Sequence, residues 1–377
     1  MSRMRALFLL LHVYVGARLL PDLPFGPAGL AAGALLLACS AALGPFAFRW
    51  RRARAAGARR LLMWGGLVAL GAFSSLVVLT VVRDAALLAL VAASVFVPLP
   101  WPLPRVLAAS AVVVPAAAAL LTLIGYANAR RIARVRDVEI PIASLPPALA
   151  GFTIAQITDV HVGPTIGRRH VEAVVDAVNA LEADLVAITG DLVDGSVAEL
   201  AHDTAPLARI AARHGVFFVT GNHEYYSGVH AWVAQLRGMG IRVLLNEHVV
   251  VEHEGEHVVV AGVTDATAHH FVPAHRSDPQ RAIAGAPPAA LKLLLAHQPR
   301  SAGPAHRAGF DVQLSGHTHG GQFLPWNFFV RFQQPFTAGL GRLGRLWVYT
   351  SRGTGYWGPP KRLGAPSEIT RLRLVCA

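Results

Sequence analysis

The stretch FDVQLSGHTHGG, residues 310–321, places a short apolar run directly before two histidines that are one residue apart. Imidazole is the commonest metal-ligating side chain, so His317 and His319 are candidate metal ligands. A single His-x-His pair is more often an ordinary polar loop. Whether this pair binds a metal therefore depends on what the rest of the chain can bring to it.

Beyond residue 150 the chain alternates strand-like and helix-like segments. The apolar runs FTIAQIT, LVAIT and VFFVT are followed by helical patterns at 168–182, 200–213 and 230–239. Further strand-like runs are RVLLN, HVVVEH, EHVVVAGV, LKLLLAH, FDVQLS, LWVYTS and ITRLRLV. This order predicts an α/β fold with a largely parallel core and some antiparallel pairing.

Side chains that bind metals follow five of these strands. In folds of this class, ligands collect at the carboxyl ends of the strands. Each strand end is a weak signal alone, but five at the same edge of one sheet are hard to explain by chance. The candidate side chains at these strand ends are Asp159 and His161, Asp191, Asn222 with His223 and Glu224, His297, and His317 with His319.

The order D-x-H, G-D-x-x-D, G-N-H-E, H and G-H-x-H resembles the calcineurin-like metallophosphoesterase superfamily over essentially all of residues 150–375. Together with its apolar N-terminal part, the chain resembles the membrane-anchored bacterial members. The resemblance implies a four-layer sandwich, in which two mixed β-sheets are flanked by helices. It also implies a metal-dependent hydrolase that cleaves phosphate esters.

The resemblance assigns two divalent ions to these ligands. One ion would be held by Asp159, His161, Asp191 and His319, and the other by Asp191, Asn222, His297 and His317. Asp191 would bridge them, because two close cations need a shared anionic ligand, and a bridging hydroxide would attack phosphorus. A mixed nitrogen and oxygen ligand set without thiolate suits Mn, Fe, Zn or Co and does not choose among them.

The same resemblance gives roles to residues that are not ligands. His223 would protonate the leaving oxygen and contact the phosphate, and Asp194 would orient His223. Arg352 and His270 are weaker candidates for substrate contact, with structural pairing and a surface loop as their simpler interpretations. Glu224 is expected to be structural.

Other histidines are expected to be solvated, among them His214 beside a helical segment and His253 at a water-facing strand position. The segment 320–336 is unusually rich in aromatic residues. It could pack in the core, or it could rest on a bilayer surface with its rings at headgroup depth.

The N-terminal third is too apolar for a soluble domain, in a chain whose residues are 54% hydrophobic. We expect a transmembrane region over 1–129, a linker over 130–150 and a catalytic domain over 151–377. Apolar runs long enough to cross a bilayer predict spans near 6–20, 28–48, 61–82 and 105–127. The stretch 85–97 could span, re-enter or lie in the interface, which leaves four or five helices.

The net charge of +12 belongs to the membrane part. Residues 1–136 hold 15 arginines against Asp22 and Asp84, whereas the remainder holds 19 basic and 20 acidic residues. We therefore expect no nucleic-acid partner. The two cysteines, Cys39 and Cys376, offer no disulfide framework.

The arginines favour a multi-pass cell-membrane protein whose catalytic domain is cytoplasmic, because basic residues gather beside spans on that side. Those that carry this inference are Arg49, Arg51, Arg52, Arg54, Arg59 and Arg60 in one loop, and Arg130, Arg131, Arg134 and Arg136 after the last span.

The leading hypothesis is a membrane-anchored phosphoesterase with two metal ions. An alternative is a membrane sensor or scaffold whose domain binds metal without turnover, and a transporter ranks last because its spans offer few ionisable residues. The motifs fit a monoester, a diester or a pyrophosphate. Anchoring in the lipid bilayer favours a lipid-linked phosphoester, and the sequence does not indicate an oligomeric state.

Overall fold

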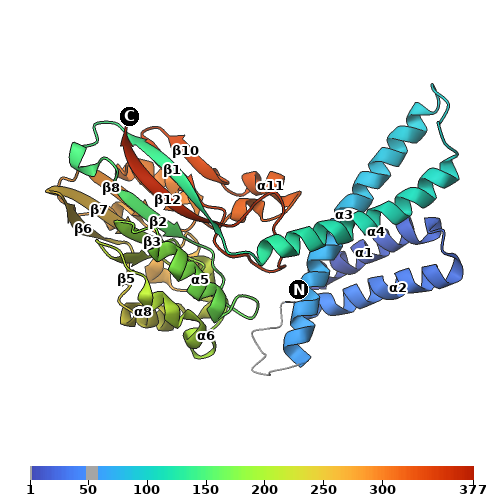
Figure 1. Cartoon of the computed structure of the whole chain (residues 1–377), viewed down its shortest axis with the longest axis horizontal. Coiled ribbons are helices and arrows are strands. Elements are labelled where there is room, and N and C mark those ends of the chain that lie inside the picture. Colours follow the sequence, from blue (N-terminus) through green and yellow to red (C-terminus); the bar gives the residue numbers. More distant parts are fainter. Residues whose placement is uncertain (1, 48–57) are drawn as a thin grey trace. The chain divides into compact units, whose positions relative to one another are not determined.

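The computed structural model describes residues 2–47 and 58–377, which form two compact units (Figure 1). The helical unit contains the chain up to Asn128 together with Gly358–Lys361. The other unit, the α/β unit, contains Ala129–Trp357 and Arg362–Ala377. The chain therefore leaves the α/β unit for four residues and then returns to it.

The helical unit is built from four helices within the described ranges, and each is long and apolar enough to cross a membrane. They correspond to the four predicted spans. The helices are α1 (Ser2–Leu19), α2 (Gly26–Leu43), α3 (Ala58–Ala93) and α4 (Leu103–Ala129). Of the loop arginines that favoured a cytoplasmic domain, Arg49, Arg51, Arg52 and Arg54 lie outside the described residues.

The ambiguous stretch 85–97 continues helix α3 as far as Ala93. No glycine or proline interrupts the sequence from Ala72 to Val97, so nothing forces a turn after residue 82. Two charged residues within α3 remain helical because both are paired: Arg83 with Asp22, and Asp84 with Arg18. The helical unit thus has four helices instead of five in the part of the chain described.

The segment Gly358–Lys361 packs within the helical unit, and Lys361 is buried. Its ammonium group donates hydrogen bonds to the carbonyl of Gly71 and to the hydroxyls of Ser75 and Thr122. A buried lysine is stable only when its charge is solvated by such polar partners.

The α/β unit contains two six-stranded sheets. The first has the order β1 (Arg134–Ile142), β12 (Glu368–Cys376), β2 (Thr153–Ile157), β3 (Leu185–Ile188), β4 (Val216–Phe218) and β5 (Arg242–Val243). The second has the order β10 (Gly339–Leu343), β11 (Leu346–Thr350), β9 (Val312–Ser315), β8 (Leu291–Leu295), β7 (Glu256–Gly262) and β6 (Glu247–His253). Both are mixed: in the first, β12 is antiparallel to β2, whereas β2 to β5 run parallel.

Apolar side chains on both faces of each sheet create four layers. Successive residues of β2, such as Ile154 and Ala155, belong to two different core clusters. The cluster between the sheets joins Ile154 to residues of β8 and β9, among them Leu293 and Leu314. Helices cover the outer faces: α5 (Arg168–Asn179), α6 (Val197–Thr204) and α8 (Val229–Gly238) on the first sheet, and α9 (Pro279–Ile283) and α10 (Ala302–Ala308) on the second. The four-layer sandwich of two mixed sheets is confirmed.

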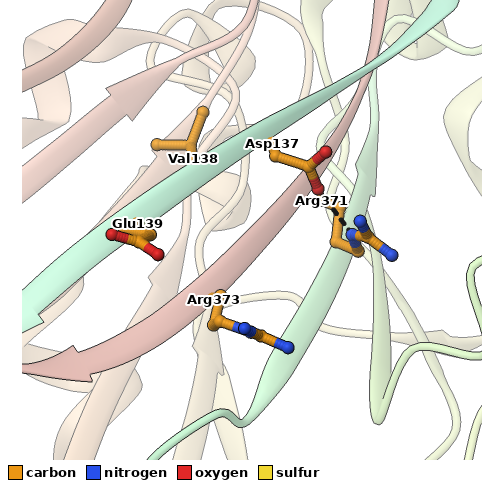
Figure 2. A pocket seen from close by; sticks show the side chains of 5 residues that line it. All are labelled: Asp137, Val138, Glu139, Arg371 and Arg373. Atoms are coloured by element: carbon orange, nitrogen blue, oxygen red, sulfur yellow. Dashed lines mark hydrogen bonds and ion pairs between the residues drawn. The ribbon is translucent and has the colours of Figure 1, made fainter.

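The region expected to be a linker, 130–150, contains strand β1, which pairs in parallel with β12. Ile140 and Ile142 of β1 are buried, while the charged residues alternate with them towards solvent. Figure 2 shows Asp137, Glu139, Arg371 and Arg373 around a surface pocket on this strand pair. The charges concealed the strand in the sequence, and they protect an edge strand from pairing with other chains.

Candidate metal centre

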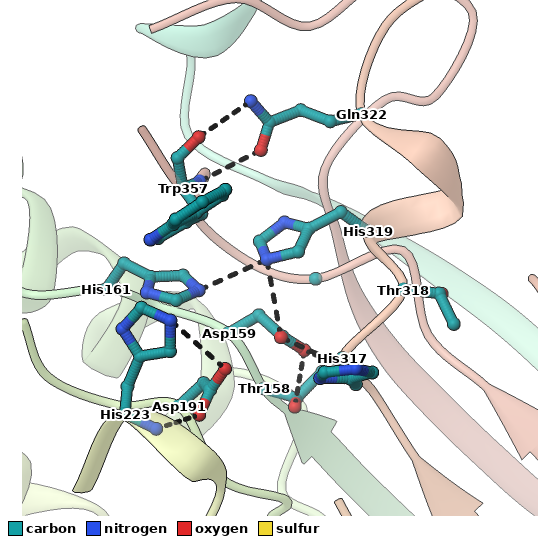
Figure 3. A network of polar contacts seen from close by, with 12 residues as sticks. Thr158, Asp159, His161, Asp191, His223, His317, Thr318, His319, Gln322 and Trp357 are labelled. Atoms are coloured by element: carbon teal, nitrogen blue, oxygen red, sulfur yellow. Dashed lines mark hydrogen bonds and ion pairs between the residues drawn. The ribbon is translucent and has the colours of Figure 1, made fainter. Parts of the chain in front are cut away.

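Six of the seven candidate ligands form two tight clusters at the carboxyl ends of the strands. Asp159, His161, Asp191, His317 and His319 are labelled in Figure 3. One cluster is Asp159, His161 and His319, and the other is Asp191, His297 and His317. Within each cluster the ligand-type atoms lie within 4.8 Å of one another. His161 and His319 are 158 positions apart in the sequence, and only the meeting of the strand ends brings such distant residues together.

The strand ends that carry the ligands come from both sheets and not from one. Strands β2, β3 and β4 of the first sheet precede Asp159, Asp191 and Asn222, and β8 and β9 of the second precede His297 and His317. The backbone N–H of His317 donates to both carboxylate oxygens of Asp159, at 3.0 and 2.9 Å, and thereby ties the two sheets together. The expectation of a single sheet edge is thus corrected.

Imidazole nitrogens approach one another closely in each cluster. The Nε2 atoms of His161 and His319 are 3.1 Å apart, and Nδ1 of His317 is 3.2 Å from Nε2 of His297. Two ligands on one tetrahedral ion, each about 2.0–2.1 Å from it, are about 3.3 Å apart. A carboxylate completes each pair, with Asp159 Oδ1 3.4 Å from His319 Nε2 and Asp191 Oδ2 3.1 Å from His297 Nε2.

Hydrogen bonds fix which nitrogen of two histidines is available to a metal. Nδ1 of His297 lies 2.7 Å from the carbonyl of Thr189, which can only accept, so this nitrogen carries the proton. Nδ1 of His161 likewise lies 3.0 Å from Oδ1 of Asp194. Both rings therefore direct Nε2, and not Nδ1, to their cluster, the arrangement in which metal-ligating histidines are usually held.

Asn222 begins helix α7 (Asn222–Ser227) and is buried. Among the described residues, its Oδ1 atom has no hydrogen-bond partner. Leaving a buried amide oxygen unpaired costs about 1–3 kcal/mol, which a cation at this place would offset. With buried Asp159 and Asp191, this oxygen gives a donor set that fits divalent metal ions.

The backbone around the ligands is strained and crowded. Five ligands have left-handed φ angles: Asp159 (52°), His161 (53°), Asp191 (49°), His317 (70°) and His319 (51°). Such conformations persist where the surrounding structure enforces them, often at functional sites. Glycine is required beside them: a Cβ atom on Gly316 would lie 2.1 Å from Asp159 Oδ2, and one on Gly221 would lie 2.2 Å from Asp191 Oδ1.

Asp194 contacts two histidines, although the sequence suggested only His223. Its Oδ1 accepts from Nδ1 of both His161 and His223, at 3.0 and 2.5 Å. Burial would raise the pKa of Asp194, but the charges and hydrogen bonds of these histidines outweigh burial and lower it below its usual range. Burial likewise would lower the pKa of His223, but Asp191 and Asp194 raise it to about 9. The two carboxylates therefore favour the protonated form of His223.

Two residues support the centre from behind. Glu224 accepts hydrogen bonds from the backbone N–H groups of Gly221, Asp191 and Leu192, which agrees with its expected structural role. Arg362 is buried, and its Nη2 lies 3.0 Å from Nδ1 of His319. Burial and the charge of Arg362 lower the pKa of His319, which keeps its imidazole neutral, as metal binding requires. No sequence motif pointed to Arg362.

The two weaker candidates for substrate contact differ in their surroundings. Arg352 is paired with Glu368, its Nη1 3.0 Å from Oε2, which is its simpler interpretation. His270 is exposed at the end of a short 3₁₀ helix, Ala268–His270.

Exposed aromatic residues, which no sequence motif indicated, lie beside His223. The rings of Tyr226 and Trp357 are 5.2 and 5.9 Å from the His223 ring, and Phe271 lies 5.4 Å from Tyr226. These three residues, the aromatic rim, are each between 42% and 49% exposed. Figure 3 shows the Trp357 indole beside His161 and His223.

Comparison with known proteins gives a consistent result. The model of the calcineurin-like phosphoesterase family matches residues 152–321. The chain is 40% identical over 270 residues to a "Transmembrane protein with metallophosphoesterase domain" of Bos taurus, covering 68% of this chain and 61% of that protein. It is 32% identical over 238 residues to an "Uncharacterized metallophosphoesterase" of Aquifex aeolicus, covering 63% of this chain and 89% of that protein.

The relatives are not confined to bacteria, since vertebrate proteins are among them. The chain spans about 60% of the length of the vertebrate proteins that it matches.

Proposed function

We propose that this chain, which belongs to the calcineurin-like metallophosphoesterase family, is a metal-dependent phosphoesterase whose two ligand clusters hold two divalent ions that act together on one phosphate. The observation that carries this proposal is the pairing of Asp159, His161 and His319 with Asp191, His297 and His317 at one set of strand ends. Asn222 would complete the second cluster. Mn, Fe, Zn and Co all suit this donor set.

When bound, two such ions supply Lewis-acid stabilisation of the phosphoryl oxygens and an activated water. The residues of the protein hold the reacting groups in position and transfer protons. Asp191 would serve both clusters, because its Oδ2 lies 3.1 Å from Nε2 of His297 in one cluster while its backbone carbonyl accepts a hydrogen bond from the N–H of His161 in the other. Buried and strained ligand loops keep this arrangement fixed before substrate arrives.

We assign His223 as the proton donor to the leaving oxygen. Its Nδ1 is occupied by Asp194, so Nε2, which lies 3.9 Å from Asp191 Oδ2, is the nitrogen available to substrate. His223→Ala should retain both ions and lower turnover by about 10²–10⁴-fold for a substrate with a poor leaving group. The loss should be smaller for p-nitrophenyl esters, whose leaving group needs little protonation. His257→Gln, at an exposed position, is the matched control.

The outcomes of this experiment separate the hypotheses. An equal loss for good and poor leaving groups would refute the role of His223 as proton donor. Two bound ions in the wild-type protein with no turnover of monoesters, diesters or pyrophosphates would instead support a metal-binding scaffold.

We further propose a lipid-linked substrate. Helix α11 (Trp326–Phe329) and the following turn expose four aromatic rings: Trp326, Phe328, Phe329 and Phe332 are 46%, 57%, 52% and 75% exposed. No acidic residue occurs between Leu314 and Phe336, and Arg331 supplies a positive charge. Aromatic and basic surfaces of this kind bind membrane interfaces. The aromatic rim beside His223 would then contact the apolar part of a lipid leaving group.

The test compares a long-chain lipid phosphate with bis-p-nitrophenyl phosphate, using the full chain in nanodiscs. Trp357→Ala and Phe271→Ala should raise KM for the lipid several-fold and leave KM for the soluble ester unchanged, because only the lipid reaches the rim. Leu343→Ala, on an exposed edge strand, serves as the control. Equal effects on both substrates would refute lipid specificity.

We also propose that the α/β unit faces the cytoplasm. The unbroken helix α3 supports this orientation, because α3 and α4 then cross the membrane once each and return the chain to the side of the arginine-rich segment that precedes α3. Arg130, Arg131, Arg134 and Arg136 follow the last span, where basic residues mark the cytoplasmic side. A cysteine at exposed Asp176, in a chain lacking Cys39 and Cys376, should resist an impermeant thiol reagent in intact cells. Labelling of intact cells would overturn this orientation.

A further inference from the structure

A third group of ligand-type side chains lies where strands β3 and β4 begin and where β6, which runs antiparallel to β7, ends. It consists of Asp184, which directly precedes β3, His214, which precedes β4 by two residues, and His253, the last residue of β6. Strands β3 and β4 belong to the first sheet and β6 to the second. This group, the amino-end cluster, therefore joins the two sheets at the ends opposite to the candidate metal centre.

The spacing of the amino-end cluster resembles that of the two clusters described above. Its three ligand-type atoms lie within 4.8 Å of one another. Nε2 of His214 is 2.9 Å from Nδ1 of His253, close to the separations of 3.1 and 3.2 Å between paired imidazoles at the candidate centre. Oδ1 of Asp184 is 4.0 Å from Nδ1 of His253 and needs only a small rotation to complete the set.

The surroundings hold these side chains in place. Oδ2 of Asp184 accepts hydrogen bonds from the backbone N–H and the hydroxyl of Thr153, both at 2.9 Å, which leaves Oδ1 directed to the histidines. The ring of Phe152 stacks on His214 at 5.8 Å and meets the edge of His253 at 4.9 Å. A hydrogen bond of 2.8 Å from the backbone N–H of His214 to the carbonyl of Asp184 fixes the two strand starts together.

One residue of the amino-end cluster is buried and two are partly exposed, as an ion-binding site requires. His253 is buried, contrary to the expectation that it faces water, and its side chain is 8% exposed. His214 and Asp184 are partly exposed, so an ion could enter from solvent. Two imidazoles and one carboxylate form a ligand set that binds Zn²⁺ with a water in the fourth position.

We propose that Asp184, His214 and His253 form a third metal site, selective for a zinc-like divalent ion, which fastens the two sheets together. The site is structural in this proposal, because its ligands lie at the opposite strand ends from His223 and the two clusters of the candidate centre. Binding would link the β6–β7 hairpin to the starts of β3 and β4, and so would stabilise an edge of the second sheet.

The experiment measures zinc bound to the purified full chain in detergent, after equilibration with micromolar Zn²⁺ and removal of excess ion. His214→Gln is the main variant because His214 is partly exposed and its replacement is compatible with folding; His253→Gln is the second. His257→Gln, on the same hairpin but exposed and outside the cluster, is the matched control. Wild type and control should bind one zinc per chain more than either cluster variant.

Hydrogen exchange provides a second measurement. Zn²⁺ should slow amide exchange in residues 247–262 of the wild type by at least several-fold, and should do so equally when His317→Ala disables the candidate centre. The slowing should be absent in His214→Gln. Equal zinc content in wild type, His214→Gln and His257→Gln, or unchanged exchange in this hairpin, would overturn the proposal and leave the cluster as a hydrogen-bonded pair of rings.

Discussion

Replacing Gly316 with alanine tests the candidate centre through a single added methyl group. The new Cβ atom would lie 2.1 Å from Asp159 Oδ2 and 2.2 Å from Thr158 Oγ1, whereas contacts under 3.0 Å essentially never occur. The Asp159 carboxylate must therefore move by about 1 Å, several times the tolerance of about 0.2 Å for a metal–ligand distance. Gly316 does not have a left-handed φ angle, so this effect is steric and not conformational.

Gly316→Ala is expected to lose much of the ion that Asp159 holds and to lower turnover by about 100-fold, the cost of an ångström of misplacement at a reacting centre. After loading with Mn²⁺ alone, metal content measured by mass spectrometry should fall from two ions towards one ion per chain, and turnover of bis-p-nitrophenyl phosphate should fall with it. The matched control is Gly238→Ala at the end of α8, where an added Cβ meets nothing within 4 Å.

The reasoning would be refuted if Gly316→Ala bound two ions and retained turnover within threefold of Gly238→Ala. Loss of thermal stability in Gly316→Ala without loss of metal would also contradict it. In that case the crowding at Asp159 would be relieved by backbone movement, and the ligand loops would be less rigid than their left-handed residues indicate.

Three further predictions address the support of the centre, its stability and its metal dependence. Asp194→Asn should weaken metal binding by about 10–100-fold through His161 and lower turnover through His223, whereas unchanged affinity in a Mn²⁺ titration would restrict Asp194 to His223. Burial and the charge of Arg130 lower the pKa of His170 to about 4, so the unfolded chain alone gains this proton as pH falls from 6.5 to 4. Stability should therefore be lost across that range, by at most about 3 kcal/mol, and Tm measured against pH should fall less steeply in His170→Leu. Chelation should abolish turnover and lower Tm, because Asp159 and Asp191 are then buried without a counter-ion. Adding Mn²⁺ should restore both turnover and Tm. Full activity after exhaustive chelation would contradict the metal-dependent mechanism.

The core strands could be predicted from the sequence because both of their faces are buried. Runs such as LVAI and LKLLL are apolar almost throughout, as strands covered on two sides must be. Strand β1 could not be predicted in this way, since its outer face is charged and its partner, β12, lies more than 200 residues away. Helix α3 posed the opposite problem, because the charged residues Arg83 and Asp84 separate two apolar runs in the sequence and only the structure pairs them with Asp22 and Arg18.

The candidate ligands could be proposed because metal chemistry restricts the residue types and places them directly after strands. Their supporting residues could not. Arg362 reaches His319 from a segment with no motif, and Tyr226 and Trp357 lie beside His223 only in the folded chain. The prediction that His253 faces water was wrong for a related reason. Its burial depends on contacts with Phe152 and His214 from the other sheet.

The four-residue excursion Gly358–Lys361 limits how this protein can be divided. A soluble fragment that begins after α4 would still carry Lys361, but without Gly71, Ser75 and Thr122 to receive its hydrogen bonds. Residues 358–361 would then lose these partners, and they connect Trp357, whose ring is 5.9 Å from the His223 ring, to Arg362, whose Nη2 is 3.0 Å from His319 Nδ1. Deleting the membrane helices therefore also changes the environment of residues next to the metal centre. A soluble enzyme would need a redesigned loop in place of residues 358–361.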